Sequence, residues 1–135
     1  MAELTIDAAL DQLETVLEFV NGQMEAVGCS QKLMAQVDMA VEEIFVNIAR
    51  YAYHPEVGEA KVRCEAGGDP FQVVVGFADR GRPYNPLARE DPDVTLDAEQ
   101  RQIGGLGIFM TKKLMDDIQY EFQDGQNILT LRKKG

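Results

Sequence analysis

The feature that most constrains the fold is a change in the spacing of apolar residues near the middle of the chain. Up to residue 51 these residues recur every three or four positions, as they do on one face of a helix. The two helical stripes comprise Leu10, Leu13, Leu17, Val20 and Met24, then Leu33, Val37, Ala40, Ile44 and Ile48. Gly28 fits a helix stop, and Asp7 and Ser30 fit helix N-caps. Helices are therefore predicted over residues 7–28 and 31–51.

After residue 60 the apolar residues alternate instead, which is typical of strands. KVRCEAG (61–67) and FQVVVGFAD (71–79) predict one hairpin, and the segments flanking Asp124-Gly125 predict another. ELTI (3–6) predicts a short edge strand. A third helix is predicted to follow the glycine cluster, with Ile108, Thr111, Leu114 and Met115 facing inward. This order predicts an α+β two-layer sandwich, with a mostly antiparallel (mixed) sheet and about three helices on one face.

Size and charge narrow the functional classes. A chain of 135 residues, 45% of them hydrophobic, fits one domain with its own core, residues 1–135. The net charge of −10 disfavours direct binding of nucleic acid or of an anionic membrane. There is neither a run of about 18 apolar residues nor a basic-then-apolar leader pattern, so a cytoplasmic location is expected. Cys29 and Cys64 are expected to be reduced, buried thiols.

Two polar side chains interrupt the second predicted helix. At about 100° per residue, Asn47 lies roughly 60° and Glu43 roughly 100° from the centre of the apolar stripe. Both therefore fall on one flank, at the border between core and solvent. One interpretation is that both are ordinary polar side chains at the protein surface. The other is a site, because a carboxylate can accept a hydroxyl proton and an amide oxygen suits Mg²⁺.

Asp79 closes a predicted strand, and Gly81 follows two residues later. This pattern can be an ordinary turn. Alternatively, an aspartate at a strand end can accept a hydrogen bond from an exocyclic amine such as adenine N6. Gly81 would then let a flat ring approach the backbone closely.

A glycine cluster, Gly104, Gly105 and Gly107 with Leu106 among them, opens the third predicted helix. It can be a simple helix-entry turn, or its bared backbone N–H groups can bind phosphate. The polar, proline-containing residues 82–103 precede it. Their length is typical of a lid over a site.

The order of these motifs resembles the N, G1 and G2 boxes of the GHKL ATPase superfamily, and within it the bacterial anti-sigma-factor serine/threonine kinases. The matching residues are Glu43-Ile-Phe-Val-Asn47-Ile-Ala-Arg50-Tyr-Ala-Tyr53, Asp79-Arg-Gly81-Arg-Pro83-Tyr84-Asn-Pro86 and Gly104-Gly105-Leu-Gly107-Ile-Phe109. The resemblance covers nearly the whole chain and implies the Bergerat ATP-binding fold.

The resemblance also implies roles. Glu43 would be the general base and Asn47 the Mg²⁺ ligand, while Asp79 and Gly81 would bind adenine. Gly104, Gly105, Leu106 and Gly107 would hold the ATP phosphates, under an ATP lid at 82–103. The implied substrate is a small antagonist protein of the STAS type in transcription regulation, and a sigma factor and a homodimer are further partners that the family allows. The alternative is an ATP-switched binding module that sequesters a sigma factor or other partner without efficient phosphotransfer.

Some positions stay open at this stage. Tyr51 stands where the family has histidine, and His54 is expected on the surface. Arg50 fits the arginine of the family motif, and a solvated position or an ion pair is an equal interpretation. Arg80 and Arg82 stand at positions that vary in the family and could contact phosphate or a partner. Asn127 and Thr130 both lie on the last predicted strand, and the pattern does not decide which of them serves the nucleotide site.

Overall fold

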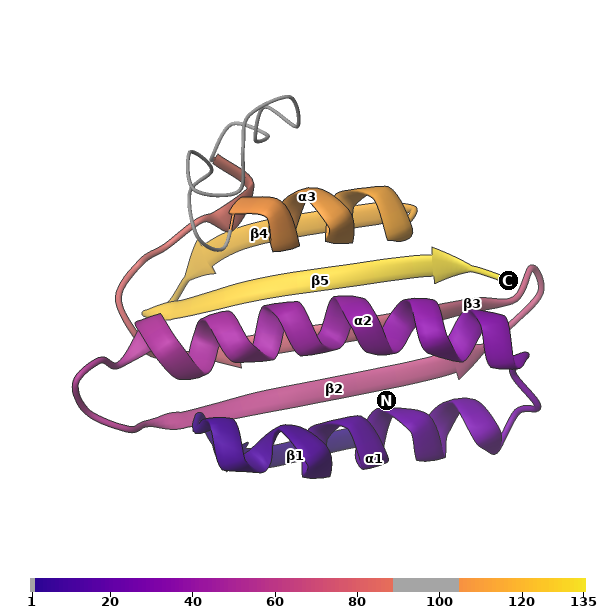
Figure 1. The fold of residues 1–135 in the computed structure, drawn as a ribbon, viewed down its shortest axis with the longest axis horizontal. Helices are drawn as coiled ribbons and strands as arrows, with labels where there is room; N and C mark the ends of the chain where they lie inside the picture. Colours follow the sequence, from indigo (N-terminus) through magenta and orange to yellow (C-terminus); the bar gives the residue numbers. More distant parts are fainter. Residues whose placement is uncertain (1, 89–104) are drawn as a thin grey trace.

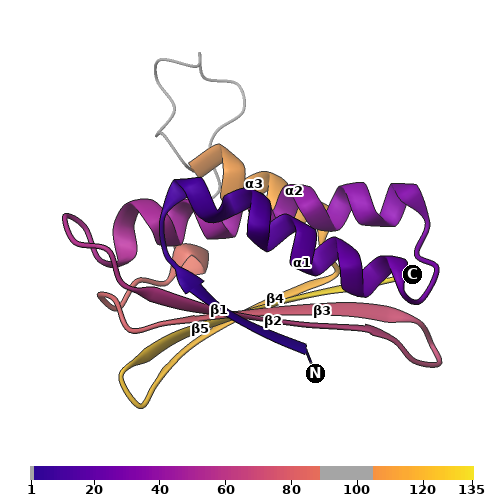
Figure 2. The ribbon, with the colours of Figure 1, turned by 90° about the horizontal axis from the view of Figure 1, so that it is seen from below.

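The computed structural model describes residues 2–88 and 105–135. Its strands form one five-stranded sheet in the order β1-β2-β3-β5-β4, and every neighbouring pair is antiparallel (Figures 1 and 2). The strands are β1 (Ala2–Asp7), β2 (Glu59–Gly67), β3 (Gln72–Asp79), β4 (Asp117–Gln123) and β5 (Gln126–Lys134). The predicted edge strand and both predicted hairpins are therefore confirmed.

The helices lie on one face of this sheet, which Figure 2 shows edge-on. They are α1 (Leu13–Glu25), α2 (Gln31–Asn47) and α3 (Gly105–Leu114), with a π-helical turn, η2 (Ile48–Ala52), continuing α2. Short 3₁₀ turns, η1 (Leu10–Gln12) and η3 (Pro86–Ala88), lie outside these elements. The predicted two-layer α+β sandwich is thus confirmed, and the described sheet is antiparallel throughout.

The core fills the space between the two layers. Its fully buried members are led by Phe45 of α2 and Phe77 of β3, with valines of α1, α2, β2 and β3 around them. Because side chains of a strand alternate between faces, each strand contributes every second residue to this core. The other face of the sheet carries no helix of the described chain. The core therefore anchors α2 over the middle of the sheet, and this fixes the helix that carries Glu43 and Asn47.

The start of the first helix differs from the prediction. Asp7 is not an N-cap, because β1 continues through it, paired with Glu59 of β2. The next residue, Ala8, still donates its N–H to Gly58, 2.8 Å away. The helix proper therefore begins later, and Leu10 is 49% exposed instead of lying on the buried stripe. Long-range strand pairing overrides the local capping signal here.

Other local signals hold. The Ser30 hydroxyl accepts a hydrogen bond from Leu33 N at 3.2 Å, so Ser30 is the N-cap of α2 as predicted. Asp124 and Gly125 both have positive φ, the geometry of a type I′ hairpin turn. Cys29 and Cys64 are free thiols; Cys64 is buried as expected, whereas Cys29 is only half-buried. Burial raises the pKa of Cys64 to about 12. None of the helices in the described part of the chain combines the length and apolar character needed to cross a bilayer.

Candidate functional site

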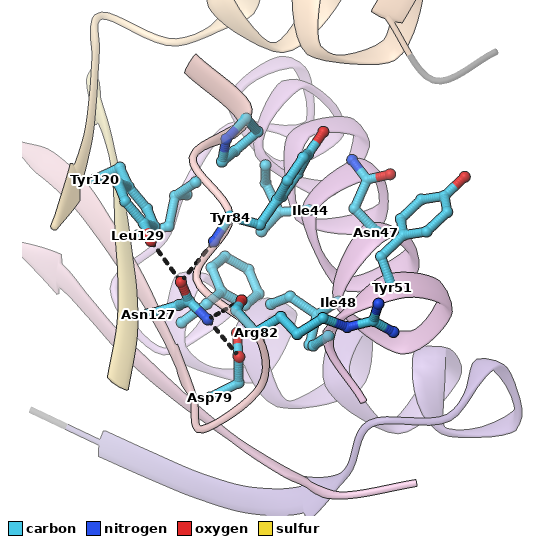
Figure 3. A pocket seen from close by; sticks show the side chains of 13 residues that line it. Ile44, Asn47, Ile48, Tyr51, Asp79, Arg82, Tyr84, Tyr120, Asn127 and Leu129 are labelled. Atoms are coloured by element: carbon cyan, nitrogen blue, oxygen red, sulfur yellow. Dashed lines mark hydrogen bonds between the residues drawn. The ribbon is translucent and has the colours of Figure 1, made fainter. Parts of the chain in front are cut away.

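A pocket lies between α2 and η2 on one side and the ends of β3, β4 and β5 on the other (Figure 3). Including space open to solvent it encloses about 480 Å³. The lining residues are Ile44, Asn47, Ile48, Tyr51, Ala52, Phe77, Asp79, Arg82, Tyr84, Pro86, Tyr120, Asn127 and Leu129. Two residues singled out from the sequence, Asn47 and Asp79, therefore face one pocket from opposite walls.

Two hydrogen-bond donors hold the Asp79 carboxylate on the strand side of the pocket. It is the last residue of β3, only 6% exposed, and is paired in register with Asn127 of β5. Its Oδ1 accepts from Gly81 N at 2.9 Å and from Asn127 Nδ2 at 3.0 Å. No described residue donates to its Oδ2. The carboxylate therefore has one oxygen occupied by the protein and one left for a ligand.

Asn127 ties the segment after β3 to the sheet. Its Nδ2 also lies 2.8 Å from the carbonyl oxygen of Arg82, and its Oδ1 accepts from Tyr84 N at 3.1 Å and from the Tyr120 hydroxyl. Donors and acceptors on both sides fix which way the amide points. Asn127 is 7% exposed, so these bonds are shielded from water.

The structure shows which of Asn127 and Thr130 lies at the pocket. Asn127 faces the helices and the pocket, whereas Thr130 lies three residues further along β5, opposite Gly76 of β3. An odd number of residues along a strand reverses the side-chain direction. Thr130 accordingly lines a wide hollow on the helix-free face, not the pocket.

Glu43 and Asn47 meet on the last turns of α2. Asn47 Nδ2 donates to Glu43 Oε1 at 3.1 Å. This bond commits the nitrogen of the amide and leaves its oxygen available for another partner. Glu43 is half-buried beside the pocket and is not part of its lining.

Burial raises the pKa of the Glu43 carboxyl, and the hydrogen bond from Asn47 and the charge of Arg50 partly oppose this shift. A carboxylate with raised pKa binds a proton more readily than an exposed one. This is the property expected of a general base.

Gly81 is required by packing. A Cβ at this position would lie 2.2 Å from the carbonyl oxygen of Ala52 in η2. The turn after Asp79 and the end of the α2–η2 helix therefore touch backbone to backbone. The close approach of a flat ring to Gly81, expected from the sequence, stays a prediction.

The segment predicted to bind phosphate is described in part. Gly105, Leu106 and Gly107 form the first turn of α3, whereas Gly104 and residues 89–103 of the predicted lid lie outside the described residues. The inward face predicted for this helix is confirmed, because Ile108 and Thr111 are buried, Met115 just beyond it is too, and Leu114 is half-buried. Phosphate binding at its N-terminus stays a prediction.

The remaining residues singled out from the sequence lie in different parts of the structure. Arg82 lines the pocket, and its guanidinium donates to the carbonyl oxygen of His54, an exposed residue. Tyr51 lines the pocket as well and is 47% exposed. Arg80 instead lines the hollow on the helix-free face. Arg50 is exposed and reaches the site through its charge on Glu43.

Sequence reasoning gave no role to two tyrosines around the pocket, Tyr84 and Tyr120. Side chains two apart on a strand share a face, so Tyr120 lies on the helix side of the sheet with Ile118. The direction of the Tyr120 side chain could therefore have been predicted from the sequence IQYEF. Its bond to Asn127 could not, because that depends on side-chain reach across the hairpin.

Comparison with known proteins shows to which family the chain belongs. The histidine kinase-like ATPase domain family matches residues 6–133. The chain belongs to this family. The serine-protein kinase RsbW of Listeria monocytogenes is 30% identical over 115 residues, covering 82% of this chain and 72% of the relative. The RsbW kinase of Bacillus mycoides is 26% identical over 131 residues, covering 94% and 81%.

Solved structures share the fold. The RsbU and RsbW domains of a Mycobacterium tuberculosis protein align with a TM-score of 0.64 at 18% identity, over 98% of this chain and 32% of that one. The chain thus spans about a third of that larger structure. The SiaB–SiaC complex from Pseudomonas aeruginosa aligns with a TM-score of 0.61 at 17% identity, over 98% and 89%. Two predictions are confirmed: the GHKL superfamily with its anti-sigma-factor serine kinase type, and the enzyme class of protein serine/threonine kinases.

Proposed function

We propose that this protein transfers the γ-phosphoryl group of Mg-ATP to a serine or threonine of a small STAS-type antagonist protein, as part of transcription regulation. The observation that carries the proposal is the placement of Asn47 and Asp79 on opposite walls of one pocket. One wall offers a ligand for a cation, and the other an acceptor for a base. Use of ATP fits the cytoplasmic location expected from the sequence.

Adenine is the base that the Asp79 wall would accept. The Oδ2 atom of Asp79 can accept a hydrogen bond from the 6-amino group, while its Oδ1 stays bound to Gly81 and Asn127. Apolar side chains, Ile44, Ile48, Phe77 and Leu129, line the same pocket and suit the faces of a purine. A base with a 6-oxo group would bring an acceptor against an acceptor.

Asn47 fits a magnesium ion bound mainly through phosphates. Among residues 2–88 and 105–135, no three His, Cys, Asp or Glu side chains gather to hold a metal. Mg²⁺ in nucleotide sites commonly takes one or two protein oxygens together with phosphate and water oxygens. The amide oxygen of Asn47 suits that mode, and Glu43 holds the amide by its nitrogen. The ion would neutralise charge on the phosphates.

Phosphotransfer needs little further protein chemistry. The hydroxyl oxygen of the substrate forms a bond to the γ-phosphorus, the bond to the bridging oxygen of ADP breaks, and Glu43 accepts the hydroxyl proton. The N–H groups of Gly104, Gly105, Leu106 and Gly107 would hold the phosphates at the start of α3. Residues 82–103 would close over them as a lid.

The test measures ATP affinity and phosphorylation of a candidate STAS-type protein in parallel, for the wild type, Glu43→Gln and Asn47→Ala. Asn47→Ala should weaken Mg-ATP binding and phosphotransfer together, because it removes a metal ligand. Glu43→Gln should leave ATP affinity within a few-fold and slow transfer by roughly 10²–10⁴-fold, as expected for loss of a general base. Transfer that survives unchanged in Glu43→Gln would refute its catalytic role.

The same assay separates the kinase from an ATP-switched binding module. A module that only sequesters a sigma factor would bind ATP in the wild type without labelling any candidate antagonist. In that case Glu43→Gln would change affinity for the partner and not a rate. Labelled serine or threonine in the wild type rejects that alternative.

A further inference from the structure

Tyr53, the residue directly after η2, joins three parts of the chain through one hydroxyl. The hydroxyl donates to the carbonyl oxygen of Glu59 at 2.6 Å, and it accepts from the backbone N–H of Arg80 at 2.7 Å. Glu59 is the first residue of β2, and Arg80 directly follows Asp79. A single side chain thus connects the end of the α2–η2 helix with the turn that carries the proposed adenine acceptor.

The ring of Tyr53 is held in place by close packing. A Cβ on Gly58 would lie 2.4 Å from the ring, so the ring rests directly on the backbone there. A turn closed by Glu56 N and the carbonyl oxygen of Tyr53, 2.8 Å apart, holds the backbone on the other side. The hydroxyl therefore has a fixed position and needs little ordering before it binds Arg80.

Neighbouring contacts close the same joint. Arg82 N donates to the carbonyl oxygen of Ala52 at 2.9 Å, and Gly81 packs against Ala52 without room for a side chain. Residues 80–82 therefore lie along the end of the helix, with the bond to Tyr53 at the point nearest Asp79. This joint, formed by residues 51–54 and 80–82, connects the two walls of the pocket by direct hydrogen bonds.

We propose that Tyr53 is a positioning residue for recognition of the nucleotide base. Its hydroxyl fixes the peptide after Asp79 relative to the helix that carries Asn47. The inference rests on the proposed function, because the two walls must keep one spacing only if one ATP bridges them. Without the bond, the Asp79–Arg80 peptide can rotate, and the carboxylate loses its alignment with the 6-amino group.

Tyr53→Phe isolates this role, because it keeps the ring on Gly58 and removes both hydrogen bonds. The readout is the ratio of dissociation constants for Mg-ATP and for purine-riboside triphosphate, which lacks the 6-amino group. The wild type should prefer ATP, and Tyr53→Phe should lose roughly 3- to 10-fold of that preference, the size expected for one weakened hydrogen bond. A variant that was only less stable would bind both nucleotides less well by the same factor.

Ser30→Ala is the matched control. It removes one hydrogen bond, at the end of α2 that is remote from the pocket. Its preference for ATP should equal that of the wild type. Gly58→Ala provides a second route, because the added Cβ displaces the ring and should reduce the preference in the same direction as Tyr53→Phe.

The outcomes separate the inference from the proposed function. A wild type that binds neither nucleotide, or binds both equally, refutes the ATP site or the adenine assignment, and Tyr53 has then no base to position. A wild type that prefers ATP, together with a Tyr53→Phe variant that keeps the full preference, overturns the positioning role alone. Equal weakening of both nucleotides in Tyr53→Phe overturns it as well.

Discussion

The two ends of α2 lie over the same sheet, yet they are completed in different ways. At the N-terminal end, the Ser30 hydroxyl caps the helix by accepting a hydrogen bond from Leu33 N, three residues further along the chain. The buried face is apolar from Leu33 to Val41. At the C-terminal end, the helix passes into the π-helical turn η2. The carbonyl groups at its end and in the residues directly after it accept hydrogen bonds from a residue far away in sequence. Arg82 supplies two of them, to Ala52 and to His54.

This difference separates stability from function along one helix. The N-terminal end needs only its own residues and the core, so it contributes to stability without any link to the pocket. The C-terminal end is completed by the segment after β3, which also forms the pocket wall. π-helical turns are rare and are often found at functional sites. We therefore expect changes at the C-terminal end to affect nucleotide binding, and changes at the N-terminal end to affect stability alone.

The largest effect is expected from Gly81→Ala, which breaks the C-terminal end. The new Cβ would lie 2.2 Å from the carbonyl oxygen of Ala52, so backbone would have to move. A loss of unfolding free energy on the order of 3 kcal/mol or more is expected, together with loss of ATP binding. Urea unfolding and ATP titration check this.

Gly22→Ala in α1 is the control for that substitution. A Cβ there would have no neighbour within 4 Å, and alanine is the better helix former. It should stabilise the protein by about 0.5–1 kcal/mol and leave ATP affinity unchanged. If Gly81→Ala were tolerated as well as Gly22→Ala, the joint between residues 51–54 and 80–82 would not be as tight as described.

A smaller effect, confined to binding, is expected from Asp79→Asn. The single oxygen of the asparagine would accept from Gly81 and Asn127, and its nitrogen would then point a donor at the 6-amino group. ATP at 100 times the wild-type Kd should stabilise the wild type by about 2.7 kcal/mol and the variant by almost nothing. Thermal unfolding with and without Mg-ATP measures this, and Asp11→Asn, an exposed acid outside the pocket, is the control. A full ATP-induced gain in Asp79→Asn would remove adenine recognition from this residue.

What could be predicted from the sequence follows the same division. Local signals were sufficient for the Ser30 cap, the Asp124-Gly125 turn and the apolar face of α2, because each depends on residues close in sequence. The pair of Glu43 and Asn47 could also be placed, since one helix repeat brings them together. Asn127 and Tyr53 could not be assigned, because their bonds depend on the β3–β5 register and on the joint after η2. The start of α1 was wrong for a related reason, the pairing of Asp7 with β2.

An effect of about 1 kcal/mol is expected at the N-terminal end, from Ser30→Ala. The change removes the acceptor for Leu33 N and leaves a helix N–H without its cap. The unfolding free energy measured by urea denaturation should fall by that amount, while ATP affinity stays the same. A clear loss of ATP affinity in Ser30→Ala would show that the two ends of α2 are coupled, so that stability and function are not separated along this helix.

The smallest effect is expected from Asp38→Asn, on the part of α2 that packs toward α1. Burial raises the pKa of Asp38, and a side-chain hydrogen bond from Asn21 partly opposes the shift. Within the described chain, Asp38 Oδ1 and Asn21 Oδ1 are buried oxygens without a hydrogen-bond partner. Asparagine would remove the charge and could turn a donor toward Asn21 Oδ1. At pH 7 a gain of about 0.5 kcal/mol in unfolding free energy is expected, allowing for the partial exposure of the site.

The pH dependence of that gain has a definite sign. Because the pKa of Asp38 is higher in the folded state, its charge destabilises the fold above that pKa, and the cost disappears as the pH falls below the unfolded value of 3.8. The advantage of Asp38→Asn should therefore be full at pH 7 and shrink toward pH 4. Glu18→Gln, an exposed acid on α1, changes the net charge equally and should show neither the gain nor the trend. An advantage that stays constant from pH 7 to pH 4 would rule out the buried charge as its cause. In either case ATP affinity should not change, because this face of α2 lies outside the pocket.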